Sequence, residues 1–514
     1  MRNKILLLLL AALLLAGVGR LQNSLNADRD ALGLTRVTPL ENAPPVLAFT
    51  TVALGGFRGL ISNMLWIRAS DLQDDDKFFE MAQLADWITK LEPHFVQVWL
   101  VQSWNMAYNI SVKFTDFKDR WRWVKRGIEL LRDEGIPYNP NATLLYRELA
   151  WFFQHKMGAN LDDANMYYKQ QWSEEMAKVF AKKKPNLQEL IHPQNDDQRA
   201  RARLLRETYK MDPELMAQVD ERYGPLEWRL PEAHAIYWAA LGLKKAQEHP
   251  AKINKDDLIT LRRVIYQSMQ TAFQRGRLVA DPFIKQFEFG PNLDIIPKVS
   301  AAYEQAAEED AENHDHILRA HRNFLRDAVY FLYEHNRMKD AAYWFSYLSQ
   351  KYPSQPIIDN QPNSFPRNLT LDQYAVGRIK EDIGETSRDR VKSAIEGLLT
   401  QSYLCLVKDG EEDRSTGLRI LADKVWEAYT TKTQLRNNPA PTGEPAPIAL
   451  PPVSEIAKAM LDRLLDPQRG LLPEGRALLR VKLQMPPEIA PAPGTTTNTP
   501  PETAERLSAN PSSP

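Results

Sequence analysis

The chain has 514 residues, of which 43% are apolar, so it is long enough for several domains or for one long repeat array with a sizeable core. Its 65 lysines and arginines balance 66 aspartates and glutamates, so the protein as a whole has no net positive charge that would attract nucleic acid. The single cysteine, Cys405, excludes an internal disulfide and a cysteine-held zinc site, so we expect stability to come from packing.

An export signal opens the chain. Arg2 and Lys4 precede an uninterrupted apolar run that extends from Ile5 to Val18. We interpret residues 1–25 as an uncleaved membrane anchor, because the small residues after the run form no clear cleavage site; a cleaved signal peptide is the alternative. The positive flank predicts a single-pass protein of the inner membrane with a periplasmic body, or a secreted periplasmic protein if the signal is cleaved.

A juxtamembrane segment, residues 26–70, contains a second apolar stretch from residue 46 to 67. This stretch is long enough to cross a bilayer, but on a helix Arg58, Ser62 and Asn63 would lie near one another and form a narrow polar stripe. We therefore expect a buried or interfacial helix at 46–67, with a second membrane span as the alternative.

Beyond about residue 71, apolar residues recur at the spacing of amphipathic helices, and no alternating run predicts a strand. The predicted fold class is all-α. Proline- and glycine-containing breaks separate the helices, and towards the end the chain becomes rich in proline and poor in large apolar residues. We expect, in order, helical repeats at 71–358, one or more further helical hairpins at 369–435, a proline-rich linker at 436–453, a short helical pair at 454–483 and a disordered tail at 484–514.

The most regular pattern is a helical hairpin at residues 322–355, which ends at Pro353. A turn separates two apolar faces, whose residues are Leu325, Ala328, Val329 and Leu332 on the first helix and Ala341, Phe345 and Leu348 on the second. This segment resembles the tetratricopeptide repeat, a hairpin of about 34 residues in which small residues let two helices approach and a proline ends the second helix.

Weaker matches to the same family lie earlier in the chain. Trp99 stands six residues after Pro93, and Tyr146 stands six residues after Pro140, where the family places a large residue at the first core position of the next helix. A further first helix is expected at 231–243, with an apolar face of Ile236, Ala239, Ala240 and Leu243. Long intervening stretches do not fit the repeat. The resemblance therefore implies an irregular tetratricopeptide-like α-solenoid over roughly half the chain.

The resemblance also implies a concave groove that binds extended peptides or partner helices. Residues at the matching groove positions are Gln97, Trp104, Tyr108, Arg147, Trp151, His155, Asn323, Arg326, Tyr330 and Tyr333. Aromatic rings, guanidinium groups and amides suit the recognition of peptide backbone and carboxylates; the alternative is that the aromatic residues pack against irregular neighbours. Asn105 and Asn109 share a helix face outside these positions, and we expect their amides to bond to the backbone or to each other.

No motif for a catalytic nucleophile, a phosphate-binding loop, a dinucleotide site or a helical zinc site occurs in the sequence. The only histidine cluster, His314, His316 and His321 with nearby carboxylates, lacks the spacing of a zinc site on one helix face, and we interpret it as a solvated helix start. We expect no catalytic residue, no metal and no cofactor.

The sequence favours a non-enzymatic, membrane-tethered scaffold or adaptor that binds a protein or peptide partner through the groove, as part of a membrane-associated complex. Two alternatives remain open. The 12 tryptophans and 18 tyrosines also suit an all-α, toroid-like enzyme that acts on glycans, because aromatic rings stack on sugars. An accessory subunit of a membrane transport or secretion complex is the other alternative.

Overall fold

The computed structural model describes residues 58–488, with interruptions at 76, 181–184, 249–254, 281–286, 360, 384–387 and 437–449, and isolated positions between residues 14 and 28. The predicted disordered tail, the proline-rich linker, the export signal and the first half of the 46–67 stretch lie largely outside the described residues. Within the described part of the chain, no helix combines the length and the apolar character needed to span a membrane.

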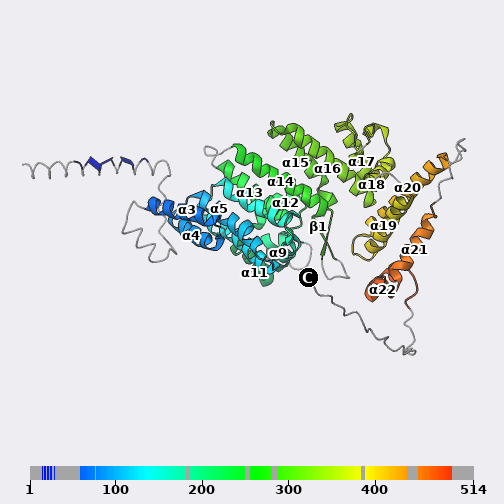
Figure 1. Ribbon diagram of the computed structural model, residues 1–514, viewed down its shortest axis with the longest axis horizontal. Helices are drawn as coiled ribbons and strands as arrows, with labels where there is room; N and C mark the ends of the chain where they lie inside the picture. Colours follow the sequence, from blue (N-terminus) through cyan, green and yellow to red (C-terminus); the bar gives the residue numbers. More distant parts are fainter. Residues whose placement is uncertain are drawn as a thin grey trace, which may run out of the picture. The chain divides into compact units, whose positions relative to one another are not determined.

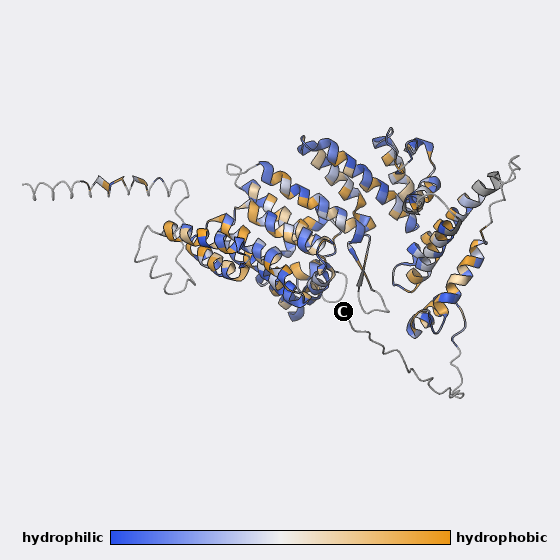
Figure 2. Cartoon of the chain, in the orientation of Figure 1, coloured by the Kyte–Doolittle hydropathy of each residue, from blue (hydrophilic) through white to orange (hydrophobic). Residues whose placement is uncertain are grey.

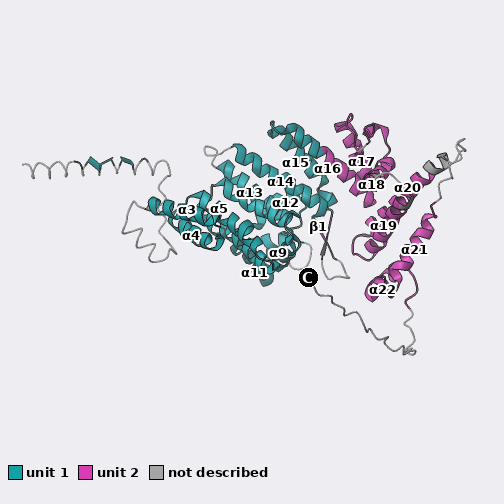
Figure 3. Ribbon diagram, viewed as in Figure 1, with its two compact units in different colours: residues 1–277, 291–321 teal, residues 278–290, 322–514 magenta. Residues whose placement is uncertain are grey.

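Helices make up almost all of the regular structure, which confirms the predicted all-α class. The chain divides into two compact units, drawn in separate colours in Figure 3. Unit 1 comprises the chain up to residue 277 together with 291–321, and unit 2 comprises 278–290 and the chain from 322 onward. The sequence pattern did not predict the two short strands, β1 (Arg277–Ala280) and β2 (Phe287–Gly290), which pair in a small sheet.

Unit 1 consists of consecutive helices, several of which continue directly into a π-helical or 3₁₀ turn (Figure 1). Its elements are α3 (Arg58–Asp74), α4 (Phe78–Leu91), α5 (Val96–Trp104), the π-helical η2 (Asn105–Ile110), the 3₁₀ turn η3 (Ser111–Lys113), α6 (Phe117–Glu129), the π-helical η4 (Leu130–Gly135), α7 (Ile136–Tyr138), α8 (Thr143–Trp151), the π-helical η5 (Phe152–Gly158), α9 (Asn165–Phe180), α10 (Gln188–Ile191), α11 (Asp196–Glu207), α12 (Pro213–Tyr223), α13 (Pro231–Glu248), α14 (Lys255–Arg275), the 3₁₀ turn η7 (Leu293–Ile295) and α15 (Ile296–Glu309).

Helix α16 (His314–Glu334) begins in unit 1 and continues in unit 2. The remaining helical elements of unit 2 are α17 (Met338–Lys351), the 3₁₀ turn η8 (Pro366–Asn368), α18 (Leu371–Ile383), α19 (Arg388–Leu406), α20 (Glu412–Arg436), α21 (Val453–Leu465) and α22 (Pro473–Lys482). The last two helices occupy the range expected for a short helical pair. They pack with α19 around a small core of Tyr403, Val407, Leu465 and Leu479.

The two proline-to-aromatic matches have a direct structural basis. The indole Nε1 of Trp99 donates a hydrogen bond of 2.8 Å to the carbonyl of Pro93, and the hydroxyl of Tyr146 donates one of 2.8 Å to the carbonyl of Pro140. Both aromatic side chains are 2% exposed. A buried polar group needs such a partner, so each aromatic residue fixes the turn that precedes its own helix while filling the core.

The hairpin at 322–355 corresponds to the end of α16 and the whole of α17. Six of the seven residues expected on its apolar faces are at most 1% exposed, namely Leu325, Ala328, Val329, Leu332, Ala341 and Leu348. Phe345 is half-buried and packs against the ring of Tyr374, with centroids 5.6 Å apart. The periodicity of this segment therefore identified the buried faces of both helices.

Helix α3 is rich in apolar residues, which are coloured orange in Figure 2, and several of its large apolar side chains are exposed. One of its faces packs on α4, where Ala69 and Leu72 are buried with Met81. Another face carries Leu60, Met64 and Ile67, which are 50%, 60% and 65% exposed. Because the spacing of these residues places them on one side of the helix, the chain presents an apolar stripe directly after the undescribed residues 46–57.

Candidate functional site

Four side chains of the predicted groove form one connected group of rings, which we call the aromatic cluster: Trp104, Tyr108, Trp151 and His155. The rings of Trp104 and Tyr108 stack with centroids 4.0 Å apart, and those of Trp151 and His155 stack at 4.6 Å. A hydrogen bond of 3.1 Å between the Tyr108 hydroxyl and Nδ1 of His155 joins the two pairs. Trp104 is 41% exposed and the other three residues are half-buried. The cluster is therefore open to a ligand.

The same local geometry positions both pairs of rings. Trp104 is the last residue of α5 and Trp151 the last residue of α8, and each helix continues into a π-helical segment that carries Tyr108 or His155. Residues four apart share one helix face, which explains the stacking. Tyr108 and His155 are 47 residues apart, as are the two tryptophans. An internal repeat thus builds the cluster, and π-helical segments are frequent at functional sites.

A cavity of about 480 Å³ adjoins the cluster and is lined in part by Tyr108 and His155. Lys156, which is 4% exposed, reaches Asp162 Oδ2 with its Nζ at 2.6 Å and lies 5.0 Å from the centroid of the Tyr108 ring. Arg120 Nη1 contacts Asp162 Oδ1 at 3.3 Å. Asp162 is therefore held by two cations at the edge of the rings.

The electrostatics of this cavity keep the rings neutral and the carboxylate ionised. Burial lowers the pKa of Lys156, although the hydrogen bond to Asp162 opposes that effect. Burial would raise the pKa of Asp162, but hydrogen bonds from Lys156 and from the backbone of Ala164 outweigh it and lower the pKa. Burial and the charge of Lys156 lower the pKa of His155, so its imidazole is neutral at pH 7.

The other two groove candidates of unit 1 lie on the same helices as the cluster. Gln97 is exposed near the start of α5. Arg147 lies on α8, where its Nη2 donates a hydrogen bond of 3.0 Å to Oε2 of Glu148. Glu148 is buried, and burial raises the pKa of its carboxyl despite the nearby Arg147 charge. Arg147 is thus tied to its neighbour, whereas Gln97 is an exposed polar residue near the start of α5.

The four candidates from the hairpin at 322–355 belong to unit 2, and two of them are buried. Arg326 has a side chain only 7% exposed, with ion pairs of 3.1 Å to Asp359 Oδ1 and 3.0 Å to Glu381 Oε1. Tyr333, 1% exposed, donates a hydrogen bond of 2.8 Å to Asp372 Oδ1. These two side chains connect α16 to the following elements of unit 2 and do not face an open groove.

The remaining two candidates of that hairpin are more accessible. Asn323 is exposed on α16. Tyr330 is half-buried, and the guanidinium of Arg378 lies 5.8 Å from the centroid of its ring. The Tyr330 ring also lies beside that of Phe331, with centroids 6.2 Å apart.

Three residues outside the aromatic cluster, Asn105, Asn109 and Cys405, have ordinary structural roles. The Asn105 amide donates to the backbone carbonyl of Phe78 at 3.4 Å, and the Asn109 amide donates to Asn105 Oδ1 at 3.3 Å, as expected. Cys405 is buried, and burial raises the pKa of its thiol to about 11, which makes it a poor nucleophile.

The histidine cluster does not assemble as a unit. His321 is fully buried and its Nε2 lies 2.9 Å from Ser300 Oγ, whereas His314 is exposed beside Asp315. Among the described residues, no group of three or more histidine, cysteine, aspartate or glutamate side chains is arranged to hold a metal ion.

Sequence reasoning did not single out Lys156, Arg120 or Asp162. Besides its ion pairs, Asp162 accepts a hydrogen bond of 2.9 Å from the backbone N–H of Ala164 just before α9. The sequence of η5, FFQHKMG, mixes apolar and polar residues, so it gave only a weak signal that Lys156 is buried and needs a partner. The sequence could not identify Asp162 as its partner, because this residue lies in a loop outside η5. The nearby charge of Arg120 comes from another helix, α6.

Comparisons of the chain with protein-family models, with curated proteins and with solved structures found no match.

Proposed function

We propose that the protein is a non-enzymatic, membrane-tethered scaffold of the tetratricopeptide-like type, whose aromatic cluster binds a peptide segment of a partner protein on the extracytoplasmic side. The observation that carries this proposal is the row of joined rings, Trp104, Tyr108, His155 and Trp151, on two helices related by an internal repeat. Flat, neutral rings held in fixed orientations provide contact area at a low entropic cost, which suits peptide backbone and prolyl or aliphatic side chains.

The charged groups of the adjoining cavity favour binding over catalysis. General acid–base chemistry needs a carboxyl whose proton can move near neutral pH. Asp162 instead has a lowered pKa and accepts from Lys156 and Arg120 at the same time. This arrangement supports a rigid wall beside the rings, and it makes Asp162 itself a poor general acid for the glycan-acting alternative.

The exposed stripe of α3 supports the membrane-tethered part of the proposal. Leu60, Met64 and Ile67 belong to the second half of the apolar stretch 46–67, and together they form an exposed apolar stripe of the kind that marks a protein or membrane interaction site. A membrane surface or a membrane-bound partner next to the anchor would cover them. In this proposal the chain belongs to a membrane-associated complex, of a transport, secretion or other kind.

Site-specific photocrosslinking tests the binding proposal. A benzophenone amino acid placed at Gln97, on the exposed part of α5, should crosslink to a discrete protein partner in membranes of cells that make this chain. The same probe at Tyr343, which is 63% exposed on α17 of unit 2, serves as the control position. Crosslinking from Gln97 should fall roughly tenfold when Trp151→Ala removes one ring of the cluster, because hot-spot aromatic residues contribute about 2 kcal/mol or more.

Two outcomes would count against the scaffold proposal. Crosslinks from Gln97 that are insensitive to Trp151→Ala would show that the rings do not recognise the partner. Release of reducing sugar ends from purified cell-wall glycan by the full chain, abolished by the same substitution, would favour the enzyme instead.

A further inference from the structure

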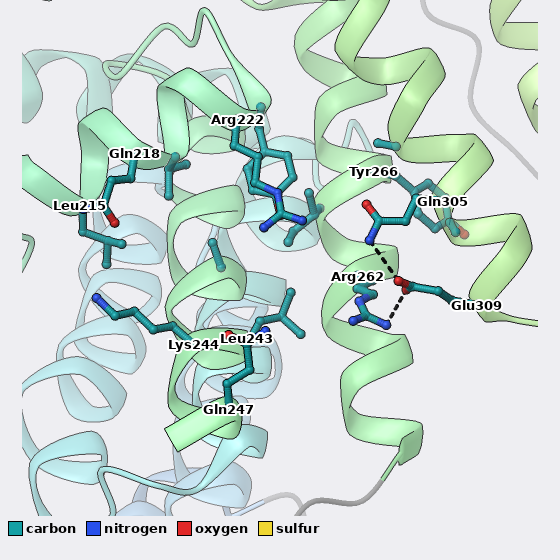
Figure 4. A pocket seen from close by; sticks show the side chains of 16 residues that line it. Leu215, Gln218, Arg222, Leu243, Lys244, Gln247, Arg262, Tyr266, Gln305 and Glu309 are labelled. Atoms are coloured by element: carbon teal, nitrogen blue, oxygen red, sulfur yellow. Dashed lines mark hydrogen bonds and ion pairs between the residues drawn. The ribbon is translucent and has the colours of Figure 1, made fainter. Parts of the chain in front are cut away.

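A second pocket lies elsewhere in unit 1, between helices α12, α13, α14 and α15 (Figure 4). Its volume is about 210 Å³. It shares no residue with the aromatic cluster or its cavity.

Apolar side chains form the floor of this pocket. Val219, Ile265 and Ala306 line it and are at most 7% exposed, whereas Ala240 and Leu243 line it and remain half-buried. The last two belong to the apolar face predicted for α13, so part of that face is left without the neighbour that would cover it in a closed core. Binding of an apolar side chain in such a site is favourable, because it removes apolar surface from water.

The rim of the pocket is mainly cationic. Arg222 from α12 and Lys244 from α13 stand on one side in Figure 4, and neither has a carboxylate within ion-pair distance among the described residues. On the other side Arg262 and Glu309 form an ion pair, and Gln305 Nε2 donates to Glu309 Oε1 at 2.9 Å. The only carboxylate of the lining is thus already neutralised, and two positive charges remain for a ligand.

The size of the pocket decides between a small molecule and a side chain of a protein. Sites for drug-sized ligands and cofactors occupy roughly 300–1,000 Å³. A pocket of about 210 Å³ is below that range and fits an anchor side chain or two, as at the centre of a protein interface.

We propose that this pocket is a second docking site of the protein, which receives an apolar anchor residue flanked by aspartate or glutamate on a short segment of another protein. The anchor occupies the floor formed by Val219, Ile265 and Leu243, and the acidic flanks pair with Arg222 and Lys244. The site goes beyond the function proposed for the aromatic cluster, since each site has its own residues and can be inactivated without the other.

A random heptapeptide library displayed on phage, selected against the purified full chain in detergent, tests this inference. Enriched peptides should carry acidic residues next to a leucine, isoleucine, methionine or phenylalanine. A synthetic peptide of the enriched sequence, labelled with fluorescein, should bind roughly tenfold more weakly to Arg222→Glu and to Lys244→Glu in fluorescence anisotropy, because like charges then face each other. Lys178→Glu, an exposed position on α9, is the matched charge control and should bind as the unchanged chain does.

A substitution that fills the pocket separates docking from attraction between charges. Ala240→Phe leaves every charge in place, and it should also weaken binding roughly tenfold if the anchor enters the pocket. A thermal melt identical to that of the unchanged chain establishes that the variant is folded. Selection of no acidic peptide, equal binding to the charge-reversed variants, or full binding to folded Ala240→Phe would each overturn the inference. Trp151→Ala should leave this peptide binding unchanged.

Discussion

At the scale of single residues, three buried rings each donate a hydrogen bond to the backbone carbonyl that lies six residues earlier in the chain. Trp99 and Tyr146 bond to Pro93 and Pro140, and His234 Nε2 donates to the carbonyl of Trp228 at 2.8 Å. In each case a side chain on the first turns of a helix closes the loop before that helix. The sequence predicted the position of the first two rings, and the hydrogen bonds explain why the ring must carry a donor.

Tyr146→Phe should therefore lower the free energy of unfolding by about 1 kcal/mol, because it removes one buried hydrogen bond and leaves the ring in place. Urea unfolding followed by circular dichroism measures the change. Tyr343→Phe, at a position 63% exposed, should change the midpoint little, since water replaces any bond of its hydroxyl. Equal effects of the two substitutions would contradict the structural role of the Tyr146 hydroxyl.

His234 predicts a specific sensitivity to acid. Its side chain is fully buried and burial lowers its pKa to about 4, and among the residues that the structure describes none accepts a hydrogen bond from a protonated Nδ1. In the unfolded chain an imidazole titrates near pH 6.5, so the unfolded state binds more protons than the folded one between pH 6.5 and about 4. Stability should fall over that window, by about 3 kcal/mol at most.

The matched variant for this prediction is His234→Phe. It loses the bond to Trp228 and is less stable at pH 7, but its stability should depend much less on pH between 6.5 and 4. Measuring unfolding free energies of both chains across this window distinguishes the histidine from the many carboxylates, whose titration is common to both. An unchanged slope in the variant would show that His234 is not responsible.

At the scale of helices, two glycines predict opposite effects of the same substitution. A Cβ atom at Gly242 of α13 would lie 2.8 Å from the Cβ of Tyr146 on α8, so this glycine permits the close approach of the two helices. A Cβ atom at Gly397 of α19 would meet nothing within 4 Å.

Gly242→Ala should destabilise the protein by about 1–3 kcal/mol, because the helices must separate to admit the methyl group. Gly397→Ala should instead stabilise it by up to about 1 kcal/mol, because alanine favours the helix and no clash opposes it. Thermal or urea unfolding of the two variants measures the difference in sign. Stabilisation by both would mean that α13 and α8 can move apart freely.

At the scale of the whole molecule, the two units divide the predicted groove residues between them. Six of the ten lie in unit 1, and four of those form the aromatic cluster, whereas Arg326 and Tyr333 help to build the core of unit 2. A partner that binds the cluster therefore needs an intact unit 1, and the buried ion pair between Arg326 and Glu381 serves stability.

Arg326→Ala should destabilise unit 2 by about 3 kcal/mol, because Glu381 then loses one of the cations that balance its buried charge. Hydrogen exchange measured by mass spectrometry should show faster exchange in peptides from α16 to α18 and unchanged exchange in peptides from α5 and α8. Photocrosslinking from Gln97 should persist in this variant. Loss of crosslinking without any change in exchange would instead place Arg326 in partner binding.

The sequence by itself determined the helical class, the buried faces of the hairpin at 322–355 and the anchoring roles of Trp99 and Tyr146, because these depend on periodicity and on turns between neighbouring residues. The tertiary structure alone decided which groove candidates meet. Tyr108 reaches His155 across two helices, Lys156 finds Asp162 in a loop, and Arg326 turns inward to Glu381. Such contacts depend on how helices and loops pack against one another in space. Helix periodicity shows which residues share a face of one helix, but it carries no information about which residues of different elements meet.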